Sequence, residues 1–271
     1  MNHSTSLKDL YQSVKKNRQL ILQMTKRNLV GKFKGSFFGL LWSFINPLIM
    51  LGIYTFAFSV VFKAKWGIDN EGHLDFALIL FASLTIFNLF GEILKESPLL
   101  IISQANFVKK VVFPLEILPI SSLLAALAHS GISLGIFVLF FGVAHLSLPV
   151  TLLLLPLVIL PLVLISLGVS YILASLGVFL RDIGYFMNHV ITILLFTSPV
   201  FFSMERIPVQ FRTLMLLNPI AYLLEDARSV MIFGKYPNWI ALGSYTVFGF
   251  VLLIFGYWTF QKTRKGFADV M

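Results

Sequence analysis

Six long apolar stretches constrain this chain more than any other feature of its sequence. They cover approximately residues 36–62, 74–95, 114–145, 150–180, 187–204 and 239–260. A membrane-spanning helix needs about 20 mainly apolar residues, whereas a barrel strand needs only about 10 and alternates in polarity. These stretches are too long for barrel strands and do not alternate. The sequence therefore predicts an all-α membrane protein with six transmembrane helices.

Charged residues are scarce and mostly basic. They make up 12% of the 271 positions, about half the share in an ordinary soluble domain, while hydrophobic residues make up 58%. The net charge of +9 comes from lysines and arginines that flank the apolar stretches, which favours lipid headgroups over nucleic acid as their partner. If the N-terminus is cytoplasmic, 15 of the 21 basic residues lie on that side. This bias predicts a multi-pass protein of the cytoplasmic membrane with both termini inside.

The N-terminal arm is amphipathic. Apolar residues recur at helical spacing on one face, and lysines occupy the other face. This pattern predicts an interfacial helix that lies along the membrane, and the alternative is a soluble basic arm. The apolar residues are Leu7, Leu10, Tyr11, Val14, Ile21 and Met24.

Two loops are also amphipathic. The segment 96–112 is too short and too polar to cross the membrane, so we expect a short helix beneath it. The segment 205–238 holds two stretches broken at Asn218-Pro219 and Gly234, which predict short re-entrant helices before the last span. The whole chain, residues 1–271, is then one transmembrane domain. It comprises an interface arm (1–34), a six-span bundle (36–260) and a cytoplasmic tail (261–271).

Motifs for chemistry are missing from the sequence. It contains no GxxxxGK[ST] phosphate-binding loop and no GxGxxG, HExxH or GxSxG pattern. We therefore expect no catalytic residues, no metal site and no cofactor in this chain. No charged residue falls near the middle of a predicted span, which argues against an ion-coupled carrier and a membrane enzyme. No filter sequence indicates an ion channel.

Two regions carry a resemblance to a known family. The first reads GKFKGSFFGLLWSFINPL (31–48). The second combines LGVFLRDIGYFMNHVITILLFTSPVFF (176–202) with LNPIAYLLEDAR (217–228). In this order and spacing they resemble the permease subunit of ABC-2 type polysaccharide exporters, most closely the O-antigen exporter permease. The family also carries capsule and teichoic acid chains.

The resemblance implies partners and a cargo. It implies a homodimer bound to two copies of an ATPase that holds ATP and Mg²⁺, since this chain lacks a phosphate-binding loop. It implies a polysaccharide linked through a pyrophosphate to a polyprenyl lipid. The arm (about 7–28) and the loop helix (about 97–107) would contact the ATPase. The candidate contacts are Ser97, Gln104, Asn106 and Phe107.

Aromatic residues are candidates for the substrate path. They form 15% of the chain, and their faces pack on sugar C–H surfaces without binding one sugar tightly. The alternative is that they face lipid or other helices. The candidates are Trp42, Tyr54, Phe196, Phe201 and Phe202.

Glycines recur at every fourth position just before the first span. If residues 31–39 are helical, Gly31, Gly35 and Gly39 form one stripe, which predicts tight helix packing. The same packing is predicted for Gly131 with Gly135, and for the stripe Ser166, Ser170 and Ala174. The functional alternative is a gate at which Lys32 and Lys34 meet the pyrophosphate.

The pair Arg181-Asp182 follows the fourth span. It is counted with the glycines and the two lysines among the candidate gate residues, where it would receive motion from the ATPase. The alternative is an ordinary charge pair at a helix end. For the whole protein, the alternatives to O-antigen export are a permease for capsule, teichoic acid or a small lipid or drug, and an enzyme acting on lipid-linked sugars.

Overall fold

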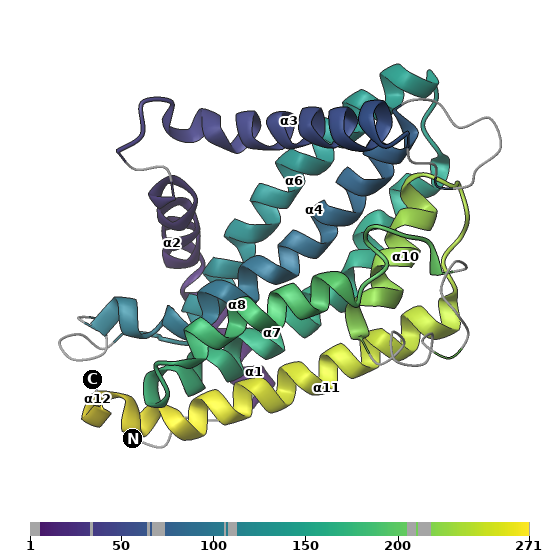
Figure 1. Cartoon of the computed structure of the whole chain (residues 1–271). Coiled ribbons are helices and arrows are strands. Elements are labelled where there is room, and N and C mark those ends of the chain that lie inside the picture. Colours follow the sequence, from purple (N-terminus) through teal and green to yellow (C-terminus); the bar gives the residue numbers. More distant parts are fainter. Residues whose placement is uncertain are drawn as a thin grey trace.

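The structure is a computed structural model that describes residues 6–32, 35–63, 66, 74–105, 107, 113–204, 210 and 218–270. Every regular element within these residues is helical (Figure 1). The long helices are α3 (Trp42–Tyr54), α4 (Asp75–Glu96), α6 (Ile117–His145), α7 (Leu155–Phe179) and α11 (Trp239–Thr263). Helix α3 is preceded by η1 (Gly39–Leu41) and followed by η2 (Thr55–Val61), and α7 is preceded by η5 (Val150–Leu154).

The shorter elements lie before, between and after these helices. They are α1 (Leu7–Lys16), α2 (Arg18–Gly31), η3 (Ser97–Leu99), η4 (Ile102–Gln104), α8 (Ile183–Phe196), α10 (Pro219–Met231), η7 (Arg264–Gly266) and α12 (Phe267–Val270).

Five apolar helical segments are long enough to span a membrane. They are Gly39–Val61, Asp75–Leu99, Ile117–His145, Val150–Phe179 and Trp239–Gly266. They match five of the six predicted stretches, so the chain is an all-helical, multi-pass membrane protein. The remaining stretch, 187–204, forms the 14-residue helix α8, about 21 Å long against a hydrocarbon core of about 30 Å.

Polar contacts define the two ends of the bundle. At one end, Arg264 after the last span donates a hydrogen bond to Glu116, just before α6. Both chain termini lie at this end, which we call the terminal end (Figure 1). At the opposite end, His145 at the end of α6 pairs with Asp75 at the start of α4, with 3.0 Å between Nε2 and Oδ1. Helices α4 and α6 therefore run in opposite directions. Helices α7 and α11 run in the same direction, since Gly249 lies beside Pro161 and Gly256 lies beside Gly168.

Helix α4 occupies the centre, and α7 and α11 form the closest helix pair. A Cβ atom on Gly256 of α11 would overlap the carbonyl oxygen of Gly168 in α7. The predicted small-residue stripe of α7 is confirmed, because Ser166, Ser170 and Ala174 are fully buried. The prediction for Gly131 and Gly135 is wrong within this chain, since a Cβ there would have no neighbour within 4 Å.

The N-terminal arm consists of two helices, α1 and α2, separated at Asn17. Ser6 caps α1 by accepting a hydrogen bond from the backbone N–H of Lys8. The protein covers part of the apolar face predicted from sequence, since Leu10, Ile21 and Met24 are buried and α2 packs against α6, whereas Tyr11 is exposed.

The glycine segment after α2 is not one continuous helix. Gly35 and Gly39 have φ angles of +88° and +48°, which favour glycine and do not occur in a right-handed helix. A Cβ atom at Gly31, Gly35 or Gly39 would meet nothing within 4 Å. The predicted stripe therefore does not form, and this segment is a bend between the arm and α3.

The second stretch of the 205–238 loop forms helix α10, which packs against α4 and α7. The side chain of Asn218 caps α10 by accepting from the N–H of Ile220 at 3.0 Å. Gly234 follows the helix with φ +63°. The first stretch lies almost wholly outside the described residues.

Candidate functional site

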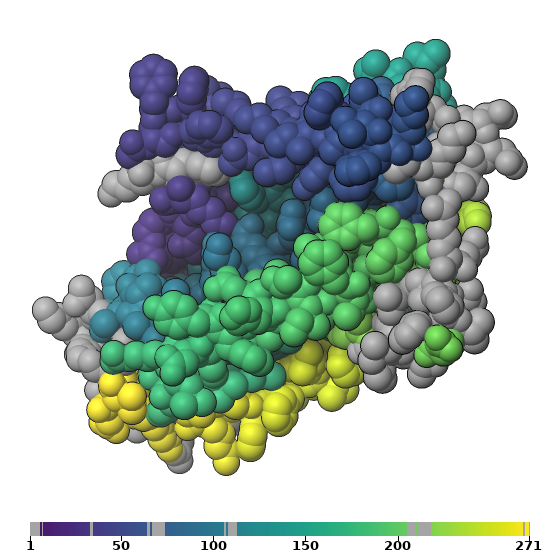
Figure 2. Space-filling model, viewed as in Figure 1, coloured from purple at the N-terminus to yellow at the C-terminus, as the bar shows by residue number. Residues whose placement is uncertain are grey.

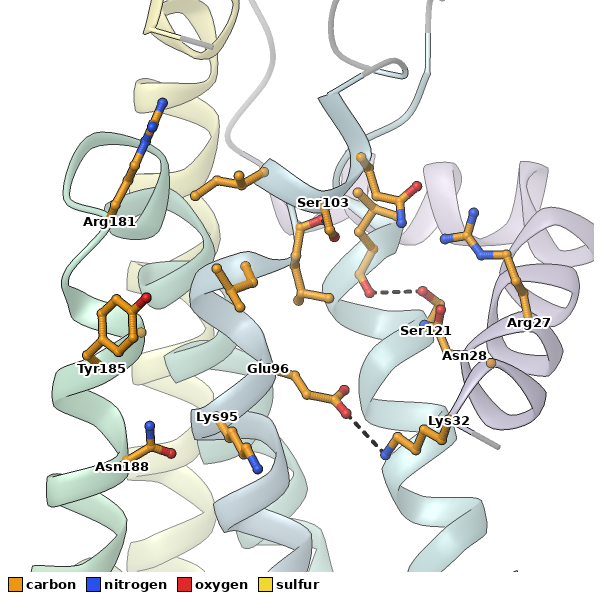
Figure 3. Close-up of a pocket in the computed structure, with 17 residues that line it drawn as sticks. Arg27, Asn28, Lys32, Lys95, Glu96, Ser103, Ser121, Arg181, Tyr185 and Asn188 are labelled. Atoms are coloured by element: carbon orange, nitrogen blue, oxygen red, sulfur yellow. Dashed lines mark hydrogen bonds and ion pairs between the residues drawn. The ribbon is translucent and has the colours of Figure 1, made fainter. Parts of the chain in front are cut away.

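A cavity of about 930 Å³ lies at the terminal end. Its two side walls are α2 and α8, and the end of α4 with η3 and η4 lies between them (Figure 3). Figure 2 shows the same face of the molecule hollowed between α3 and α8. The residues lining the cavity are Arg27, Asn28, Gly31, Lys32, Lys95, Glu96, Leu99, Leu100, Ile102, Ser103, Gln104, Leu118, Ser121, Arg181, Gly184, Tyr185 and Asn188.

Lys32 links the end of α2 to α4 through ion pairs. Its ammonium group pairs with Glu92 and lies 3.1 Å from Oε1 of Glu96. Ser122 of α6 donates to the other oxygen of Glu96 at 3.1 Å. Burial alone would lower the pKa of Lys32, but attraction by Glu92 and Glu96 outweighs it and raises that pKa above its ordinary value. Lys32 therefore stays charged and closes one side of the cavity.

The cavity carries an excess of positive charge. Four basic residues line it, and Glu96 is its single acidic residue. Among the described residues, neither Lys95 nor Arg181 forms an ion pair, and the Arg27 guanidinium lies 6.0 Å from the ring centroid of Phe107. Such a pocket attracts an anionic group, because clustered cations in a concave site add their fields.

An exposed stripe on α8 continues from the pocket. Tyr185, Asn188, Thr192 and Phe196 recur at intervals of three, four and four, so they share one face of α8. Arg181 lies in the turn just before the helix. All five side chains are exposed in the single chain. Polar groups facing lipid are costly, so this face suits contact with water better than contact with hydrocarbon.

The structure brings together residues from two separate predictions. Gly31, Lys32 and Arg181 from the predicted gate line the same pocket as Gln104 from the predicted ATPase contact. Asp182 is exposed at the start of α8. Gly35 and Gly39 lie in the bend outside the pocket, and Lys34 lies outside the described residues.

The remaining predicted ATPase contacts lie in different surroundings. Ser97 is fully buried, and its hydroxyl donates to Ile93 at 2.6 Å and contacts the Ser170 hydroxyl at 2.7 Å. Ser97 therefore joins α4 to α7 instead of facing a partner. Phe107 stacks on Phe113 with ring centroids 4.5 Å apart. Asn106 lies outside the described residues.

The predicted path residues fall into two groups. Tyr54 on α3 lines a small cavity of about 170 Å³ beside Glu92 and His129. Trp42 precedes it at the start of α3 and donates to the Ser36 hydroxyl at 2.7 Å.

The other group continues the α8 stripe. Phe196 stacks on Phe201 with centroids 6.1 Å apart, and Phe202 is half-buried beside Phe201. Sequence reasoning missed Lys95, Tyr185 and Asn188. Helical spacing from Arg181 could have found the last two.

The motif residues of the second region meet at the opposite end. The Asn218 amide donates to the Ser198 hydroxyl at 2.8 Å, and Arg228 donates to the carbonyl oxygen of Pro199 at 2.8 Å. Arg228 is only 2% exposed and lies over the ring of Trp66 at 4.5 Å. These contacts join α10 to the end of α8, which explains why two motifs about 20 residues apart occur together.

The chain is thus a helical membrane bundle with a cationic pocket at its terminal end. Residues 19–232 match the ABC-2 type transporter family, and the chain belongs to this family. It is 27% identical to an O-antigen export system permease protein RfbA from Klebsiella pneumoniae over 253 residues, covering 93% of this chain and 95% of that protein. It is 28% identical to the protein of the same name from Myxococcus xanthus over 266 residues, covering 97% and 98%.

Proposed function

We propose that this chain is the transmembrane subunit of an ATP-driven exporter that moves a lipid-linked, O-antigen-like polysaccharide across the cytoplasmic membrane. The observation that carries the proposal is the continuity between the cationic pocket and the exposed face of α8. A pyrophosphate-linked glycan needs an anion-binding site at the entrance of the transport path and a hydrated, weakly binding surface beyond it. The names of the relatives, which cover nearly the whole chain, support the same cargo.

In this proposal the membrane domain has six crossings, with α8 as the fifth. The start of α8 lies beside η3 at the terminal end, and the turn after it contacts Asn218 and Arg228 at the opposite end. Both termini are then cytoplasmic, as the distribution of basic residues predicts. The division into arm (1–34), bundle (36–260) and tail (261–271) and the re-entrant placement of α10 belong to the same proposal.

The pyrophosphate enters the pocket at the terminal end. Lys95, Arg181 and Arg27 supply the attracting charge, and Lys32 joins them when it exchanges Glu92 and Glu96 for phosphate oxygens. Gly31 leaves the arm side of the pocket uncrowded, because a Cβ there meets nothing within 4 Å. The glycan then follows Tyr185, Asn188 and Phe196, which offer stacking and hydrogen bonding at intervals.

The channel requires a second copy of the chain. The α8 stripe is exposed in the single chain. In a homodimer, the second copy would cover it and enclose a water-filled channel between the two copies. Energy comes from two copies of a separate ATPase that binds ATP and Mg²⁺. In this proposal, the segment around η4 and Phe107 and the arm α1–α2 form its docking surface.

Reconstitution in vesicles tests the proposed function. The purified chain alone should move no glycan, and addition of its ATPase with ATP and a polyprenyl-pyrophosphate glycan should start export. Glycan movement without the ATPase, or no movement with it, would refute the proposal. Parallel vesicles with a capsule-type glycan, a teichoic acid and a small lipid identify the cargo class, and hydrolysis of the lipid-linked sugar would favour the enzyme alternative.

A point variant tests whether the glycan follows the α8 stripe. Asn188→Leu removes the polar group at the middle of the stripe and should lower export by about tenfold, the range of one lost hydrogen bond to a substrate. Ile193→Leu, on an exposed part of the same helix, is the matched control and should export normally. Equal export by both variants would show that the glycan does not follow this face.

A further inference from the structure

Glu116 receives hydrogen bonds from three distant parts of the chain. The Ser13 hydroxyl of α1 donates to Oε1 at 2.7 Å, and Arg264 of η7 donates to Oε2 at 2.7 Å. The Tyr171 hydroxyl of α7 donates to the backbone oxygen of the same residue at 2.8 Å. One acidic residue therefore holds the N-terminal arm, the fourth long helix and the segment after the last span.

The same junction reaches the connector between α4 and α6. The second guanidinium nitrogen of Arg264 donates to the backbone oxygen of Phe113 at 2.9 Å. Phe113 stacks on Phe107, and Arg27 of α2 lies over the Phe107 ring. The connector carries η3 and η4, whose residues line the cationic pocket. The junction thus fixes the position of a segment that forms part of the pocket.

Apolar packing surrounds this junction with a core of its own. Leu10 of α1, Met24 of α2, Ile101 and Phe260 belong to one buried cluster at the terminal end, separate from the main core around α4. Phe267 of α12 is fully buried and lies against Phe179 and Phe260, with centroids 6.0 and 5.6 Å apart. The residues after the last span are therefore a packed part of the terminal end.

We infer that Glu116 and Arg264 are positioning residues that transmit movement of the connector to the arm and to the last span. The inference rests on the proposed function, because the movement is attributed to the partner ATPase. Each carboxylate oxygen has its own donor, so a displacement of the connector is passed to α1 and η7 together. The pair is mostly buried, with side-chain exposures of 11% and 13%, so water cannot replace a lost partner freely.

The experiment measures how much glycan is exported for each ATP hydrolysed by the complete complex in vesicles. Glu116→Gln keeps the size of the side chain and removes its charge. We expect the complex to assemble and hydrolyse ATP, while the ratio of glycan exported to ATP consumed falls by about tenfold. The charge-swapped double variant, Glu116→Arg with Arg264→Glu, should recover part of that ratio.

Asp75→Asn provides the matched control, because it weakens a carboxylate–histidine contact between two helices at the opposite end. It should leave the ratio unchanged. A purely structural role for Glu116 would lower hydrolysis and export together and leave their ratio constant, which would overturn the inference. If Glu116→Gln does not fold, Ser13→Ala removes one of the two carboxylate bonds and should still lower the ratio, and an unchanged ratio in that variant overturns the inference too.

The wild-type complex separates the two proposals. If it shows no ATP-dependent glycan export, the proposed function itself fails. If it exports glycan and the Glu116 variants keep the wild-type ratio, only the role of this junction fails.

Discussion

Helices α3 and α4 are both apolar enough to span a membrane, yet their surroundings are opposite. The segments Gly39–Val61 and Asp75–Leu99 are similarly apolar. Within their most apolar parts, 11% of the residues are buried in the first and 89% in the second. Hydropathy thus indicates which segments enter the membrane and not which of them the protein itself covers. The exposed faces of α3 are available to lipid or to a second copy.

The largest loss of stability should come from adding a side chain where α7 meets the end of α4. A Cβ atom at Gly177 of α7 would overlap the carbonyl oxygen of Pro98, directly after α4. Gly177→Val should therefore destabilise the fold by about 3 kcal/mol or more and leave little monodisperse protein. Size-exclusion chromatography of the detergent extract measures this directly. A normal elution profile and melting temperature would show that α4 and α7 separate easily.

Truncation of one isoleucine in each helix compares their packing. Ile93 of α4 is fully buried, and Ile53 of α3 is 49% exposed. Ile93→Ala should cost about 2–5 kcal/mol through the cavity it leaves, and Ile53→Ala should cost less than about 1 kcal/mol. Thermal unfolding of both purified variants gives the comparison. Equal losses would mean that a second copy covers Ile53 as completely as the protein core covers Ile93.

Breaking the ion pairs between Lys32 and α4 should lower the stability moderately. Lys32→Met leaves Glu92 and Glu96 without their cation and should cost about 1–2 kcal/mol, because the group is partly exposed. Glu92→Gln in the same chain should recover part of that loss in a double-mutant cycle. Strictly additive losses would show that the pair contributes nothing to stability.

The smallest change in stability should follow from adding a methyl group at Gly52 of α3. A Cβ at Gly52 meets nothing within 4 Å, and alanine is favoured over glycine in a helix by up to about 1 kcal/mol. Gly52→Ala should therefore leave the melting temperature unchanged or slightly raised. A clear drop that disappears when the protein is diluted to single chains would place a partner helix against this face.

The span pattern could be predicted from sequence because lipid imposes a simple length rule on apolar helices. Residues 187–204 were the exception, since α8 ends at Phe196 and the turn through Ser198 and Pro199 bonds to α10 instead of continuing as helix. The order of motifs indicated a relation between these segments. It did not indicate that Arg228 would be buried over Trp66, because such contacts depend on tertiary packing.

The candidate site was predictable only in part. Lys32, Gln104 and Arg181 were expected to act at the terminal end, and the structure places them around one cavity. The glycine spacing was misleading because Gly35 and Gly39 serve a bend through positive φ, which periodicity cannot reveal. Ser97 looked like a surface residue, yet its hydroxyl is satisfied inside the bundle.

The location of both termini at one end of the bundle has a practical consequence. Two copies of the gene can be fused head to tail with a short hydrophilic linker and no additional span, since the end of the first copy and the start of the second lie on the same side. A tandem of this kind raises the effective concentration of one half around the other. In the proposed homodimer, it would let a single half carry an altered residue, so that the contribution of each half to transport could be measured.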